Sequence, residues 1–199
     1  MNFKGMEKVA DLIVLNLLFI LLSLPVVTVG ASATAMHYAL RRWREGEGKL
    51  VRDFMKSFRL NLRQATILWC AFLVLAAAMA ANFGMIDAWT GAMYPVAAVL
   101  LTVVSAALLA WVSVVFPLLA RFDDTTGAIA KNALLIAMVS PVRSFAAACL
   151  NLLPVVLAAV LPGIFLICSV LWLGLLCAAS GLAVQLLFTP LFDRINVTT

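Results

Sequence analysis

The chain has 199 residues, of which 65% are hydrophobic and 12% are charged, and its formal net charge is +5. An ordinary soluble domain carries about 25% charged residues, so this composition excludes that class. The apolar residues gather in blocks that approach or exceed the roughly 20 residues needed to cross a bilayer. The sequence therefore predicts an integral membrane protein.

Five apolar blocks predict an all-α fold, a polytopic transmembrane helical bundle formed by a single integral membrane domain over residues 1–199. Backbone groups in lipid must find hydrogen-bond partners inside their own segment, so each block is expected to be a helix. Pro162 and Gly163 predict a tight turn between the last two blocks. The expected spans, in chain order, are about 9–29, 64–83, 94–120, 144–161 and 164–189.

The stretch LPVVTVGASATA, residues 24–35, interrupts the first block. One interpretation is a cleaved signal peptide, since Lys4 and Lys8 precede an apolar run and ASATA offers small-residue cleavage sites. Cleavage near Thr34 would export the strongly basic region that follows, against the preference of basic loops for the cytoplasm. A retained first helix is therefore the favoured interpretation.

Two further interpretations of the break remain open. Exposed backbone and hydroxyl groups could bind a substrate, as discontinuous helices do in transporters, although no matching break occurs later in the chain. In the simpler interpretation, Pro25 and Gly30 end the span, and Ser32 or Thr34 caps a new helix. The candidate break residues are Pro25, Thr28, Gly30 and Ser32.

A basic segment, residues 36–63, follows the break. Eight Lys and Arg residues occur between Arg41 and Arg63, against three Asp and Glu. Basic loops remain in the cytoplasm, so we expect this segment to be cytoplasmic. Alternating five spans around it then predicts the N-terminus outside and the C-terminus inside, which leaves Lys4 and Lys8 on the unfavoured side.

The part KLVRDFMKSFRLNLR, residues 49–63, is the most regular pattern in the chain. Its cations recur at helical spacing beside an apolar stripe of Val51, Phe54, Met55, Phe58 and Leu62. We expect an amphipathic helix at the cytoplasmic interface, with its apolar side in the acyl boundary and its cations on anionic lipids. Docking to a cytoplasmic partner is the alternative; nucleic acid is not expected, because no aromatic stacking platform is present. The candidate docking residues are Lys49, Arg52, Lys56, Arg59 and Arg63.

A second short surface helix is expected after the third span. Asp123 or Thr125 would cap it, and it would end before Pro141. Inside the spans, the amides of Asn16, Asn151 and Gln185 are expected to bridge helices.

The sequence offers no catalytic residues, no cofactor-binding residues and no metal ligands. The four cysteines lie inside apolar blocks without paired spacing, and His37 is the only histidine. We find no acidic pair, Ser–His arrangement or phosphate-binding glycine loop that would indicate an enzyme.

The sequence resembles the YesL-like family of bacterial integral membrane proteins of unknown function. The resemblance rests on residues 16–42, which contain LPVVT-x-GAS, on REGEG, and on FMKSFRLNLRQATILW at 54–69. It resumes at FPLLARFDD, residues 116–124, and at KNALLIAM, residues 131–138. It implies a multi-pass protein of the bacterial inner membrane.

The resemblance also implies an association with carbohydrate uptake. We therefore expect a non-catalytic accessory or scaffold component that partners the permease or ATPase of an ATP-driven sugar importer, as a monomer or an oligomer. A small-solute transporter is the alternative. Proton coupling through carboxylates is not expected, because the middle of each span lacks ionisable residues.

Overall fold

The computed structural model describes residues 3–46, 49–85, 93–161, 163 and 176–196, and every regular element among them is a helix. The expected all-α class is therefore confirmed for the described part of the chain. The elements are α1 (Phe3–Ser23), the 3-10 turn η1 (Val26–Thr28), α2 (Val29–Arg44), α3 (Leu50–Gly84), α4 (Met93–Leu119), α5 (Thr126–Val139), α6 (Pro141–Val160) and α8 (Cys177–Asn196).

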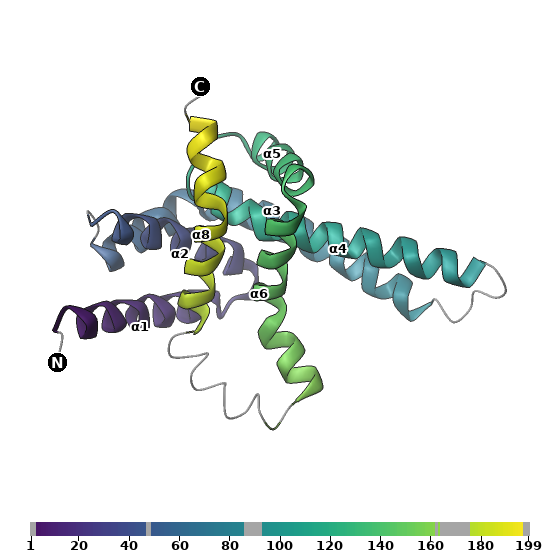
Figure 1. The fold of residues 1–199 in the computed structure, drawn as a ribbon, viewed down its shortest axis with the longest axis horizontal. Coiled ribbons are helices and arrows are strands. Elements are labelled where there is room, and N and C mark those ends of the chain that lie inside the picture. The colour runs from purple at the N-terminus through teal and green to yellow at the C-terminus, as the bar shows by residue number, and fades with distance from the viewer. Residues whose placement is uncertain (1–2, 47–48, 86–92, 162, 164–175, 197–199) are drawn as a thin grey trace.

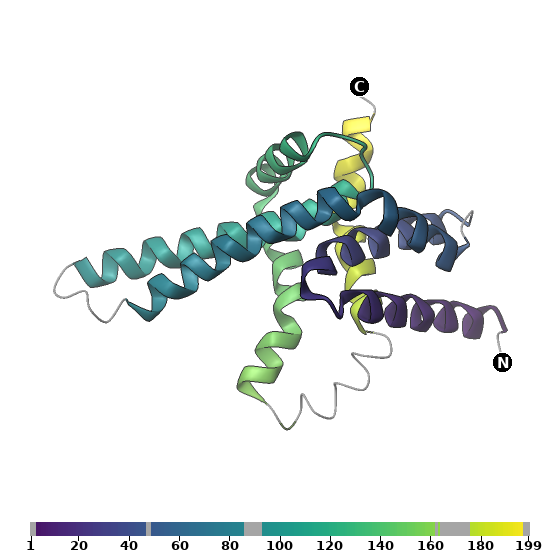
Figure 2. The ribbon, with the colours of Figure 1, turned by 180° about the vertical axis from the view of Figure 1, so that it is seen from behind.

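Helices α3 and α4 form a long antiparallel hairpin that projects from the rest of the protein (Figure 1). At 1.5 Å per residue, the 35 residues of α3 extend about 52 Å. Helix α1 lies at the other end of the molecule and runs in a similar direction, whereas α6 and α8 run across the hairpin (Figures 1 and 2). The helices therefore do not form one parallel bundle.

Three of the described helices, α3, α4 and α6, are long and apolar enough to cross a membrane. Helix α4 matches the expected span 94–120, and α6 begins slightly before the expected span 144–161. The first half of the expected span 164–189 and the predicted turn at Pro162 lie outside the described residues, and α8 covers the second half.

The expected first span, 9–29, is wrong as a single helix. Helix α1 ends at Ser23 and α2 begins at Val29. The indole Nε1 of Trp43 donates a hydrogen bond of 2.9 Å to Oδ2 of Asp11, which shows that α2 runs back along α1. The middle of α1 therefore lies beside the end of α2, and the two helices form a hairpin.

The basic segment ending at residue 63 and the expected span beginning at 64 are joined without a break. Both parts belong to the uninterrupted helix α3. No proline and no glycine occurs between Lys49 and Gly84, so nothing in the sequence breaks the helix there.

Gly30 allows α2 to pack closely on α3 and α4. A Cβ built on it would lie 2.8 Å from the carbonyl oxygen of Ala65, 2.8 Å from Cβ of Trp69 and 2.8 Å from Cε1 of Phe116. The expectation that Gly30 ends a helix is therefore wrong. It lies in the first turn of α2, where its missing side chain lets the backbones approach.

The three amides inside the apolar blocks join distant helices, as predicted. Asn16 Oδ1 accepts a hydrogen bond of 2.9 Å from the backbone N–H of Ala178. Asn151 Nδ2 donates to Ser113 Oγ at 3.1 Å, and Gln185 Nε2 donates to the carbonyl oxygen of His37 at 3.0 Å. These bonds tie α1 and α2 to α8, and α4 to α6.

Helix α5 confirms the predicted short helix after the third span. Thr125 is its N-cap, and its Oγ1 accepts a hydrogen bond from the N–H of Ala128 at 3.3 Å. The helix ends at Val139, before Pro141, which opens α6. Asp123 precedes the helix and is exposed.

Candidate functional site

The break between α1 and α2 is a turn closed by hydrogen bonds. The hydroxyl of Thr28 lies within donating distance of two carbonyl oxygens, 2.6 Å from that of Leu22 and 2.8 Å from that of Pro25. The indole Nε1 of Trp69 in α3 donates to the carbonyl oxygen of Val26 at 2.7 Å. A substrate-binding break needs free carbonyl groups, so this geometry favours a structural turn.

The other polar residues of the break do not cap α2. Thr28 directly precedes α2, but its side chain makes no cap bond there. Ser32 and Thr34 lie inside the helix; Thr34 Oγ1 donates to the carbonyl oxygen of Gly30 at 2.9 Å. The expectation that Ser32 or Thr34 caps this helix is wrong, because α2 begins earlier, at Val29, directly after the turn that follows Pro25.

Four of the five predicted docking residues lie on the first half of α3, and the fifth, Lys49, is its N-cap residue. Each side chain is exposed, and none makes an ion pair or hydrogen bond with another residue in the described ranges. We call this set the cationic stripe: Lys49, Arg52, Lys56, Arg59 and Arg63.

The apolar side of this part of α3 differs from the prediction. Phe54 is fully buried against α1 and α2, and Phe58 is half-buried at the junction of the two hydrophobic clusters. Only Val51 and Leu62 of the predicted apolar stripe are exposed. The main apolar face of this segment therefore packs inside the protein, because the α1–α2 hairpin covers it.

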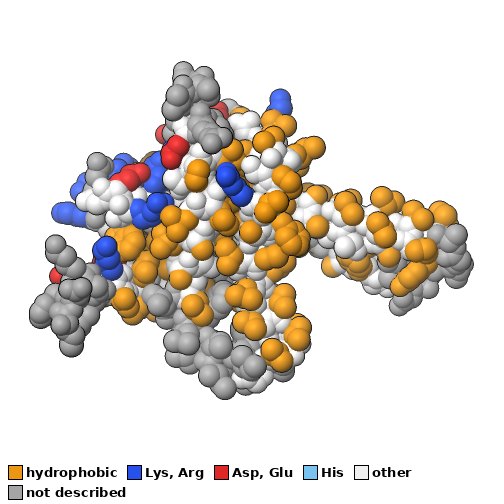
Figure 3. Space-filling model, in the orientation of Figure 1, with side chains coloured by type: hydrophobic (Ala, Val, Ile, Leu, Met, Phe, Trp, Pro, Cys, Tyr) orange, Lys and Arg blue, Asp and Glu red, His pale blue; other side chains and the backbone are white. Residues whose placement is uncertain are grey.

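Charged side chains gather at one end of the molecule. Figure 3 shows Lys and Arg side chains over α2 and its surroundings, while the projecting α3–α4 arm is hydrophobic. In the described ranges between Arg63 and Arg121, no side chain is charged. Arg42 of α2 pairs with Asp53 of α3 at 3.4 Å, which joins the two helices at the charged end.

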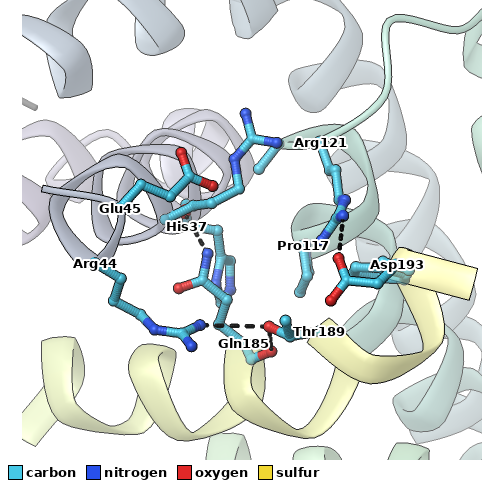
Figure 4. Close-up of a pocket in the computed structure, with 11 residues that line it drawn as sticks. His37, Arg44, Glu45, Pro117, Arg121, Gln185, Thr189 and Asp193 are labelled. Carbon is cyan, nitrogen blue, oxygen red and sulfur yellow. Dashed lines mark hydrogen bonds and ion pairs between the residues drawn. The ribbon is translucent and has the colours of Figure 1, made fainter. Parts of the chain in front are cut away.

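A pocket of about 260 Å³ lies at this end, between α2, the segment after α4, and α8 (Figure 4). Three arginines line it: Arg41, Arg44 and Arg121. Arg121 pairs with Asp193 of α8, with Nη2 and Oδ1 at 2.5 Å. Arg44 donates from Nη1 to Oγ1 of Thr189 at 3.4 Å. We call this cavity the arginine pocket.

Two buried polar side chains form its inner wall. His37 is 7% exposed and Gln185 is 9% exposed. Nδ1 of His37 and Oε1 of Gln185 have no hydrogen-bond partner among the described residues. Burial lowers the pKa of His37 to about 4, so its imidazole is neutral at pH 7.

The sequence did not predict the arginine pocket. In the sequence, Arg41 and Arg44 indicate only the cytoplasmic side of the chain, although their spacing puts them on one side of a helix. Arg121 and Gln185 lie far away in the sequence, and only the packing of α8 against α2 brings them to the same cavity.

The described residues define an all-helical protein with three helices capable of crossing a membrane. Residues 12–83 match the family described as "Protein of unknown function, DUF624". The match covers α2, α3 and most of α1, and it is consistent with the YesL-like resemblance without naming that family. No curated protein and no solved structure matches the chain.

Proposed function

We propose that the protein is a non-catalytic accessory or scaffold component of a bacterial inner membrane, and that it works with an ATP-driven importer of carbohydrates. The observation that carries the docking role is the cationic stripe, whose five exposed charges have no partner in the described ranges. Such a surface suits an acidic face of an importer permease or ATPase, or anionic lipids. The link to carbohydrate uptake rests on the resemblance alone.

The proposed orientation places the cationic stripe in the cytoplasm. Because Asp11 contacts Trp43 and lines a cavity with Lys49 and Arg52, the start of α1 belongs on the same side. This revises the expected external N-terminus and removes the exception at Lys4 and Lys8. Asp193 near the end of α8 pairs with Arg121, which supports a cytoplasmic C-terminus.

In this orientation the α1–α2 hairpin enters the membrane and returns without crossing it. Its turn meets α3 at Trp69, which is six residues after Arg63. Six residues of helix correspond to about 9 Å of depth. Another 15 residues, about 22 Å of helix, separate Trp69 from Gly84, so α3 continues well beyond the turn.

Cysteine labelling in intact cells tests this orientation. In a chain whose own cysteines are replaced by alanine, an impermeant maleimide should label Gly84→Cys but neither Lys8→Cys nor Lys56→Cys. All three should react in opened cells. Labelling of Lys8→Cys in intact cells would restore the external N-terminus, and labelling of Lys56→Cys would remove the proposed docking surface from the cytoplasm.

Affinity purification in mild detergent tests the docking role. Importer subunits should be recovered with the native chain and lost with the triple variant Arg52→Gln, Lys56→Gln, Arg59→Gln. The matched variant Arg52→Lys, Lys56→Arg, Arg59→Lys keeps the charge and should retain them. Equal recovery with all three chains would refute docking through the stripe.

A cavity of about 420 Å³ supports the second candidate function, transport of a small solute. It lies among α1, α2, α3, α4, α6 and α8, and its wall includes the polar side chains of Ser113 and Asn151. Uptake of a labelled sugar by the purified protein in liposomes would favour this function over the accessory role. Liposomes without protein give the background.

A further inference from the structure

The charged groups of the arginine pocket carry a net positive charge, and its three arginine side chains, which are hydrogen-bond donors, line the same cavity. Its charged groups are the three arginines, Glu45 and Asp193, which leaves one net positive charge. Asp193 is paired with Arg121. Neither Arg41 nor Arg44 makes an ion pair within the described ranges, and Glu45 is exposed. Guanidinium groups bind oxyanions through paired, charge-assisted hydrogen bonds, so the pocket favours an anion.

The inner wall adds a requirement for a hydroxyl group. Gln185 Nε2 donates to the carbonyl oxygen of His37, and this bond leaves Oε1 as an unpaired acceptor. A buried polar atom without a partner is unfavourable, because it has lost its hydrogen bonds to water. A ligand that carries a hydroxyl beside its anionic group can donate to Oε1 while its oxygens accept from the arginines.

We propose that the arginine pocket binds a phosphate group that carries a neighbouring hydroxyl. Its volume, about 260 Å³, suits a small head group better than a large organic ligand. The phosphate can belong to a phospholipid or to a soluble phosphate ester. The lipid source has structural support, because the mainly apolar cavity of about 420 Å³ also has His37 and Pro117 in its wall. This inference is independent of docking through the cationic stripe.

Binding to the purified full-length chain in a neutral detergent tests the proposal. Glycerol 3-phosphate, followed by calorimetry, is the soluble probe. Phosphatidylglycerol, followed by native mass spectrometry, is the lipid probe, and phosphatidylcholine is its control because it lacks the free hydroxyls. The variants are Arg41→Gln and Arg44→Gln in the pocket, with Lys131→Gln on the exposed face of α5 as the charge-matched control. Because Arg44 is exposed, its replacement leaves the packing intact.

Loss of one charged hydrogen-bond donor should weaken binding about tenfold, while Lys131→Gln should bind as the native chain does. Saturable binding of glycerol 3-phosphate identifies a soluble ligand, and selective retention of phosphatidylglycerol identifies a lipid. The proposal is overturned if neither probe binds, if phosphatidylcholine is retained equally, or if the pocket variants bind as tightly as Lys131→Gln.

Discussion

Gly30→Ala should separate α2 from α3 and lower the stability of the protein. The new Cβ would lie 2.8 Å from three atoms, whereas ordinary van der Waals contact begins near 3.4 Å. Two of these atoms, the carbonyl oxygen of Ala65 and Cβ of Trp69, are fixed to the backbone of α3 and cannot rotate away. The third belongs to the buried ring of Phe116. The helices must therefore move apart by about 0.6 Å, the shortfall between these distances.

The expected loss is about 1–2 kcal/mol in the free energy of unfolding. Overpacking of a filled core costs about 1–3 kcal/mol. Alanine favours a helix over glycine by up to about 1 kcal/mol, which returns part of this cost. The displacement also stretches the hydrogen bond from Trp69 to Val26.

Two other glycines provide controls. Gly127 in α5 has nothing within 4 Å of a built Cβ, so Gly127→Ala should leave stability unchanged or raise it. At Gly181 in α8 the nearest atom, at 2.6 Å, is the terminal methyl group of Met36, which can rotate away. Gly181→Ala should therefore cost less than Gly30→Ala.

Unfolding of the detergent-solubilised protein by sodium dodecyl sulfate, followed by tryptophan fluorescence, measures the three variants. The expected order of stability is Gly127→Ala, then Gly181→Ala, then Gly30→Ala. A Gly30→Ala protein with the same midpoint as Gly127→Ala would refute the close packing of α2 on α3.

Three further outcomes are expected, each measured by the same unfolding assay. Thr28→Val removes the hydroxyl that closes the α1–α2 turn and should cost about 1 kcal/mol, whereas Thr28→Ser should retain most of the native stability. Trp69→Phe leaves the Val26 carbonyl without its indole donor and should cost about 1 kcal/mol in the free energy of unfolding. If the turn persists, the variant should elute from a size-exclusion column at the volume of the native protein. The pKa of His37 is about 4 in the folded protein and 6.5 for an unperturbed histidine, so the unfolded chain takes up the proton first as the pH falls. The stability contributed by neutral His37 is complete above about pH 6.5 and should fall by about 1 kcal/mol per pH unit down to about pH 4. His37→Gln should flatten this dependence, and an unchanged slope would show that another group is responsible.

Local patterns in the sequence predicted the helices and several of their contacts. Apolar blocks predicted an all-α protein, and the pattern around Thr125 predicted both the cap and the end of α5. The amides inside apolar blocks had to find partners, and the bonds of Asn16, Asn151 and Gln185 show those partners on other helices.

The features that were predicted wrongly or missed depend on contacts between residues far apart in the sequence, which no local pattern shows. Apolar content predicted one helix over residues 9–29, but α1 ends at Ser23, and the bond between Asp11 and Trp43 shows that α2 returns along α1. Hydropathy changes at Arg63, but helix continuity depends on the absence of proline and glycine, so α3 runs through this position without a break. Similarly, no local pattern links Arg41 to Arg121, so the arginine pocket needed the folded structure.

The unbroken length of α3 has a mechanical consequence. The cationic stripe and the hydrophobic α3–α4 arm share one uninterrupted helix. A partner that displaced the stripe would therefore also displace the arm. Gly30 and the turn at Val26 hold this helix at Ala65 and Trp69, near its midpoint. Because α3 is held near its midpoint, a displacement of the cationic stripe would tilt the α3–α4 arm in the opposite direction.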